Sequence, residues 1–128
     1  MILIIEKRTS ENSRELKNLI HDVCIENFET PENLERILLT YATRKKNEIK
    51  LIIFHASGRD GVTVSQAKEC LKKILEWKSP AALLRAVSEG EDYRSAMLET
   101  IREVKAQNAK TDSYNNLVGQ IREKLNQR

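Results

Sequence analysis

The sequence predicts the α/β class: a doubly wound parallel sheet of about five strands with helices on both faces. Two short, wholly apolar runs at 2–5 and 51–54 are rich in branched side chains, which is typical of strands buried on both faces. Segments with apolar residues at helical spacing alternate with these and other strand candidates. Such alternation indicates parallel strands joined by right-handed crossovers.

At 128 residues the chain is long enough for a single core, and we expect 1–128 to form one domain. Lys and Arg number 22 and Asp and Glu number 19, so the net charge is +3, with both signs mixed along the chain. This balance indicates an ordinary solvated surface. Nucleic acid is therefore not expected as a direct partner.

No apolar run approaches the about 20 residues that cross a bilayer, and 1–5 is too short for the apolar region of a signal peptide. We therefore expect a cytoplasmic protein with no membrane partner. Cys24 and Cys70 are isolated and lack the spacing of a metal site, so they indicate free thiols in a reducing compartment. We expect no cofactor and no bound metal.

The first half of the chain carries start signals for two helices. Ser10 can cap a helix, and Thr30 followed by Pro31 is a typical helix start. Between them, 23–29 is a weak strand candidate whose polarity favours a sheet edge. The basic run 44–46 complements a helix dipole better than it forms a phosphate-binding patch. The apolar stripes are Leu16, Leu19, Ile20 and Val23, then Leu34, Ile37, Leu38 and Tyr41.

In the second half, a polar turn to Gly61 follows the strand at 50–54, and a third helix closes at Trp77 before a break at Ser79–Pro80. The Ala and Leu content of 81–87 favours a helix. The alternation of elements favours a strand there, which we expect.

The last part of the chain is predicted to contain two more helices. Ser88, Glu89, Gly90 and Glu91 together fit a capping box that opens the fourth. A short, poor last strand is expected within 104–109, and Asp112 is expected to cap the final helix. The stripes of the third, fourth and fifth helices are Val64, Ala67, Leu71 and Ile74; Tyr93, Met97, Ile101 and Val104; and Tyr114, Leu117, Val118, Ile121 and Leu125.

Element order, spacing and local matches resemble the receiver domain of bacterial response regulators over nearly the whole chain. Residues 4–7 (Ile-Ile-Glu-Lys) stand where that family has a strand followed by an acidic pair. Residues 51–55 stand where its third strand ends in the phosphoaccepting aspartate. Residues 59–61 resemble its Met-Asp-Gly turn, 80–86 its fourth strand and 110–111 its Lys-Pro. The resemblance implies a flavodoxin-like fold and a signal-transduction role, as in two-component phosphorelays.

The chain departs from this pattern at the phosphoacceptor pocket. His55 replaces the aspartate, Lys7 replaces one member of the acidic pair, and Arg85 replaces the switch hydroxyl, although Ser88 is near in sequence. The loop after His55 is also shorter than the family pattern. The resemblance thus assigns a degenerate phosphoacceptor pocket to Glu6, Lys7, His55, Arg85 and Lys110.

These departures bear on magnesium, which receiver phosphorylation needs together with a carboxylate nucleophile. Magnesium prefers carboxylate, phosphate and water oxygens. Lys7 and Arg85 would place positive charge where the cation binds, and like charges about 4 Å apart repel by on the order of 4 kcal/mol at an effective dielectric of about 20. We therefore hypothesise a pseudo-receiver that accepts no phosphoryl group through aspartate.

The turn after the second apolar run leaves alternatives open. His55 is either a phosphohistidine or general base, or a strand-end histidine bonded to loop backbone. Ser57, Gly58 and Arg59 form either an anion-binding loop or a plain tight turn. Asp60 fits a helix cap better than a metal ligand.

Two function classes follow. The first, which we favour, is a stand-alone interaction module that binds a protein partner or forms a homodimer through 93–125, with Tyr93 and Tyr114 as candidate interface residues. The alternative is a small α/β enzyme or an anion- or nucleotide-binding protein that uses the loop 55–61 and Arg85.

Overall fold

The computed structural model describes residues 1–42, 48–77 and 82–127. Within them, five parallel strands form one sheet in the order β2-β1-β3-β4-β5, which confirms the predicted flavodoxin-like α/β fold. The basic run 44–46 and the break at Ser79–Pro80 lie outside the described residues. The strands are β1 (Ile2–Glu6), β2 (Val23–Asn27), β3 (Leu51–Ala56), β4 (Leu83–Ser88) and β5 (Ala109–Asp112).

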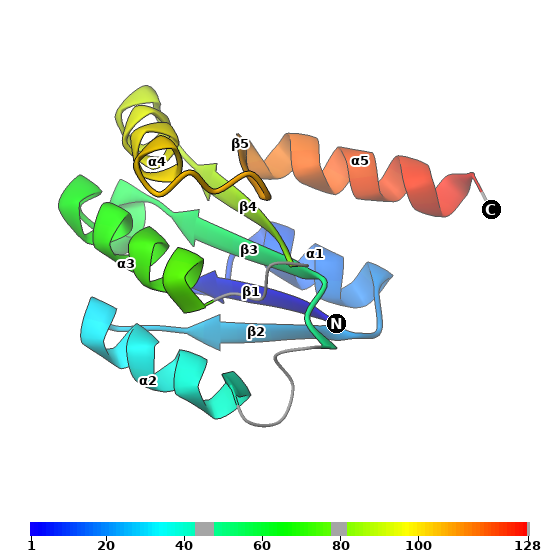
Figure 1. Cartoon of the computed structure of the whole chain (residues 1–128). Helices are drawn as coiled ribbons and strands as arrows, with labels where there is room; N and C mark the ends of the chain where they lie inside the picture. The colour runs from blue at the N-terminus through cyan, green and yellow to red at the C-terminus, as the bar shows by residue number, and fades with distance from the viewer. Residues whose placement is uncertain (43–47, 78–81, 128) are drawn as a thin grey trace.

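Helices cover both faces of the sheet, as predicted (Figure 1). One face carries α2 (Pro31–Ala42), α3 (Val64–Trp77) and α4 (Glu91–Glu103), and the other carries α1 (Glu11–Leu19) and α5 (Tyr114–Asn126). A short 3₁₀ turn, η2 (Gly58–Asp60), precedes α3. No helix within the described ranges is long and apolar enough to cross a bilayer.

β1 and β3 carry apolar runs because both of their faces are buried. Leu3 and Phe54 belong to the larger core, beneath α2, α3 and α4. Ile4 and Ile53 belong to the smaller core, beneath α1 and α5. All four side chains are fully buried, so neither strand has a solvent face that could carry polar residues.

The strand order indicates at which edge of the sheet a ligand site is expected. β1 pairs with β2 on one side and β3 on the other, so chain connections run in opposite directions from this central pair. Ligand sites of open α/β sheets lie beyond the carboxyl ends of the strands at such a reversal. In this chain Glu6 ends β1, and His55 is the penultimate residue of β3.

Several helix starts follow the predicted signals. The Ser10 side chain accepts the Ser13 N–H and caps α1, and Thr30 accepts the Asn33 N–H at 3.1 Å just before α2. The prediction that Asp60 caps α3 is wrong. Asp60 lies in η2, and Thr63 is the cap: it accepts the Gln66 N–H at 3.1 Å and donates its own N–H to Gln66 Oε1 at 3.0 Å.

The ambiguous segment is a strand, since β4 runs over Leu83–Ser88, and three local predictions near it and after it need correction. The capping box is wrong because Ser88 still belongs to β4, and Gly90, with φ of 103°, precedes α4 without a side-chain cap. The last strand begins at Ala109 instead of lying within 104–109, and Ser113, not Asp112, caps α5.

In the first half, α1 ends at Leu19, which is 40% exposed. Val23 therefore belongs to β2 and not to the predicted helical stripe. The edge position predicted for this strand is confirmed, because β2 pairs only with β1 among the described strands. Both Cys24 and Cys70 are free thiols.

Candidate functional site at the carboxyl edge of the sheet

A buried glutamate and a buried histidine face each other at the ends of β1 and β3. Glu6 is fully buried and His55 is 5% exposed, and Glu6 Oε2 lies 3.3 Å from His55 Nδ1. The second carboxylate oxygen, Oε1, accepts the Ser10 N–H at 3.1 Å. Neither Oε2 nor Nδ1 has a hydrogen-bond partner within the described chain, so their mutual ionic contact fixes how the imidazole is turned.

The other imidazole nitrogen lies near the carboxylate of Glu89, which directly follows β4. His55 Nε2 is 3.9 Å from Glu89 Oε1. The second oxygen of Glu89 accepts the Ser57 hydroxyl at 3.3 Å and lies 3.7 Å from Arg59 Nε. Three donors from β3 and its turn thus surround one carboxylate, whose side chain is 52% exposed.

Tyr114 forms the floor beneath His55. The two rings pack with centroids 5.4 Å apart, and the Tyr114 hydroxyl and Ser13 Oγ lie within hydrogen-bond distance at 2.6 Å. Burial raises the pKa of Tyr114, so its hydroxyl stays protonated. Because Tyr114 is only 6% exposed, it does not offer the interface anchor that the sequence suggested.

Above this pair lies an open hollow of about 300 Å³. Its lining combines three arginines and three exposed or half-exposed carboxylates with small hydroxyl side chains and His55. The lining therefore offers both donors and acceptors. Its two buried members are His55 and Ser57, at 5% and 2% exposed, and each can donate or accept. The lining residues are Arg8, Thr9, Ser10, Glu11, Arg14, His55, Ser57, Arg59, Asp60 and Glu89.

The turn after β3 is tight, which is compatible with both interpretations of residues 57–59. Ser57 Oγ accepts the Arg59 N–H at 3.2 Å, and Gly61 closes the turn with φ of 79°. A Cβ at Gly58 would lie 3.1 Å from the hydroxyl oxygen of Tyr93, which donates to the carbonyl of Val62 at 2.5 Å. Tyr93 is therefore partly buried and holds α4 against this turn instead of presenting an interface anchor.

Arg85 does not reach the hollow. It is the third residue of β4 and pairs with Ile53, two residues before His55. Its Nη2 donates to Asp112 Oδ2 at 2.5 Å and to Gln120 Oε1 at 3.1 Å, on the face covered by α5. The sequence alignment ended β4 too early: Ser88, and not Arg85, is at the carboxyl end of that strand.

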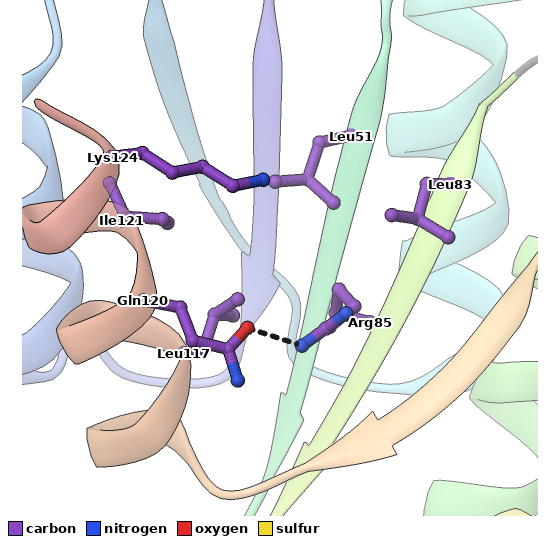
Figure 2. Close-up of a pocket in the computed structure, with 7 residues that line it drawn as sticks. All are labelled: Leu51, Leu83, Arg85, Leu117, Gln120, Ile121 and Lys124. Carbon is purple, nitrogen blue, oxygen red and sulfur yellow. Dashed lines mark hydrogen bonds between the residues drawn. The ribbon is translucent and has the colours of Figure 1, made fainter. Parts of the chain in front are cut away.

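A separate small pocket of about 90 Å³ includes Arg85 and lies between the sheet and α5 (Figure 2). Figure 2 shows its guanidinium turned toward Gln120, with aliphatic side chains of β3, β4 and α5 around the opening. The lining is Leu51, Leu83, Arg85, Leu117, Gln120, Ile121 and Lys124. This pocket is distinct in its lining from the hollow at the carboxyl edge.

Lys110 is also away from the carboxyl edge. It pairs in register with Arg85 as the second residue of β5, and its side chain is exposed. Lys7 does lie at the edge, and its Nζ is 3.5 Å from the position that a Cβ would take at Gly61. Of the five predicted pocket residues, the structure brings Glu6, Lys7 and His55 to one edge and leaves Arg85 and Lys110 elsewhere.

The predicted excess of positive charge at this edge is therefore wrong. Arg85 is neutralised by Asp112 elsewhere, while Glu6 and Glu89 bring two carboxylates to His55. Sequence reasoning missed Glu89, Arg8 in the loop after β1 and Arg14 in α1. The only signal for Glu89 was its position just beyond the end of a strand. That signal is visible only if β4 is correctly predicted to end at Ser88.

Over the described ranges, no group of three or more His, Cys, Asp or Glu side chains could hold a metal ion. Comparison of the chain with protein-family models, curated proteins and solved structures found no match.

Proposed function

We propose that this chain is a receiver-like module that transmits a signal through a protein partner or a second copy of itself, without aspartyl phosphorylation. The observation that carries the proposal is the Glu6–His55 pair, because a histidine occupies the end of β3 where an acceptor carboxylate would be required. The strand order β2-β1-β3-β4-β5 supports it, since a receiver needs that arrangement.

The two carboxylates that end β1 and β5 are engaged in ways that do not suit a phosphoacceptor. Glu6 is fully buried and shared between Ser10 and His55, whereas Asp112 is paired with Arg85 on the α5 face. Magnesium-assisted phosphoryl transfer needs carboxylate oxygens free to bind the cation and to attack phosphorus.

Partner contacts in 93–125 would be made by exposed side chains, because Tyr93 and Tyr114 are turned inward. Val104 is 39% exposed just after α4, and Lys110 is exposed on β5. A surface of this composition, with one apolar residue among charged ones, suits a transient contact better than an obligate one.

The absence of aspartyl phosphorylation is tested by incubating the protein with acetyl phosphate and magnesium and measuring its intact mass. We expect no adduct. A stoichiometric mass increase of one phosphoryl group that hydroxylamine removes, mapped to any Asp or Glu, would overturn the proposal.

The partner part is tested by light scattering across a hundredfold concentration range together with hydrogen exchange. A concentration-dependent dimer with slowed exchange in 93–125 is the expected result for self-association. No dimer and no slowed exchange in 93–125 at any concentration, with exchange that slows only around 55–61 on addition of an anion, would favour the anion-binding alternative over the partner role.

A further inference from the structure

We propose that the hollow above His55 is a binding site for a phosphate group, and that the Glu89 carboxylate is its internal occupant, displaced when phosphate binds. The inference goes beyond the signalling role and holds whether or not the chain has a protein partner. It concerns the phosphate group itself, free or carried by a monoester.

The first support is the convergence of donors on Glu89. Ser57 Oγ, Arg59 Nε and His55 Nε2 lie 3.3, 3.7 and 3.9 Å from its two oxygens. Only the first is a hydrogen bond, so the carboxylate is held loosely. A phosphate group has more acceptor oxygens than a carboxylate and can satisfy several such donors together.

The second support is that one donor is built into the fold. His55 is only 5% exposed, and its Nδ1 contacts the buried carboxylate of Glu6 on the side away from the hollow. Its Nε2 is therefore presented to the hollow by two rigid strands and not by a mobile surface chain. When both ring nitrogens carry a proton, Nδ1 faces Glu6 and Nε2 can donate to an anion in the hollow.

The third support is the charge of the lining. Three arginines face three carboxylates around the hollow, so these charges cancel while Glu89 is in place. Withdrawal of Glu89 leaves an excess of one positive charge in a lining that contains Arg8, Arg14 and Arg59. One guanidinium group can donate two hydrogen bonds to two oxygens of the same phosphate group, which favours phosphate as the anion.

Displacement is feasible because Glu89 is half exposed and Arg59 is 89% exposed. When the carboxylate moves into water it leaves the buried Ser57 hydroxyl and His55 Nε2, which phosphate oxygens then contact, and its exposed ion pair with Arg59 is weak. Ser10, the N-cap of the nine-residue helix α1, also lines the hollow, so the helix dipole adds a favourable field for an anion.

The test is a titration of inorganic phosphate into the full ¹⁵N-labelled chain, without magnesium or a phosphoryl donor, at constant ionic strength. We expect amide shifts confined to 8–14, 55–60 and 89. In Glu89→Gln, affinity should rise about five- to tenfold, the effect of removing one competing charge at a water-exposed site. In Arg59→Gln it should fall by a similar factor. A parallel titration with phosphoserine reports whether a monoester is preferred over the free ion.

Two controls match the charge changes outside the hollow. Glu91→Gln and Arg94→Gln alter exposed residues of α4 that do not line it. Equal affinities in Glu89→Gln and Glu91→Gln, or shifts spread over all basic surface, would overturn the proposal. Since no phosphoryl donor is present, this result is independent of the acetyl phosphate experiment.

Discussion

At the scale of single residues, Glu6 organises the site. It is the buried group that contacts both the start of α1, through the Ser10 N–H, and the imidazole of His55. We predict that Glu6→Gln lowers the free energy of unfolding by roughly 1–3 kcal/mol, because a buried polar pair loses one partner's charge. Urea denaturation at pH 7 measures this.

Glu11→Gln is the matched control, since Glu11 lines the same hollow but is exposed. Its effect should stay within about 0.5 kcal/mol, as for most surface substitutions. Equal losses in the two variants would show that Glu6 is not an organising group.

Residue-level prediction from sequence succeeded where position along a strand decided the outcome. Glu6 and His55 follow apolar runs directly, so their placement at one edge required only that the two strands be parallel neighbours. Glu89 was missed because its role depends on where β4 ends. The interface prediction for Tyr114 rests on helical periodicity, which shows that a stripe is apolar but not how deeply its first residue is buried.

At the scale of secondary-structure elements, Arg85 links β4, β5 and α5. It extends from β4 to Asp112 at the end of β5 and to Gln120 on α5. We predict that Arg85→Met, which keeps the aliphatic stem, lowers the free energy of unfolding by about 1–3 kcal/mol and speeds amide exchange in 109–126. Hydrogen exchange by mass spectrometry locates the effect.

The comparison variant is Lys110→Met, which alters the exposed residue paired with Arg85 across the two strands. Little change in exchange is expected there. If both variants loosened 109–126 equally, the bonds of Arg85 would not be what holds β5 and α5 together.

The elements that sequence predicted least well are those with the weakest burial. In β5 only Ala109 is buried among four residues, so no apolar run marked the strand and it was placed too early. The Ser-Glu-Gly-Glu run after β4 resembled a capping box, but strand pairing with β3 extends to Ser88 and overrides that local signal. The doubly buried β1 and β3 left no such ambiguity.

At the scale of the whole molecule, three buried acids of high pKa make the fold sensitive to alkali. Burial raises the pKa of Cys70 from 9.0 to about 12, and burial also raises that of Tyr114. Burial and a hydrogen bond to Glu26 raise the pKa of Tyr41. In the unfolded chain these groups ionise near their ordinary values. The unfolded state then binds fewer protons, so the free energy of unfolding falls as pH rises.

This stability is complete below about pH 9 and is lost progressively toward pH 12. Urea denaturation should show a fall of about 2 kcal/mol between pH 8 and pH 10, most of it from Cys70. In Cys70→Ala the absolute stability is lower, but the fall between the two pH values should shrink to under about 1 kcal/mol. An unchanged fall in that variant would assign the alkaline loss to other groups.

The central claim is that Glu6 turns the imidazole of His55 so that Nδ1 faces the core and Nε2 faces the hollow. Long-range ¹H–¹⁵N NMR of the histidine side chains tests it directly. We predict that neutral His55 carries its proton on Nδ1, toward Glu6, and that this preference weakens in Glu6→Gln. A neutral His55 with its proton on Nε2 in the wild-type chain, unaffected by that substitution, would contradict the account.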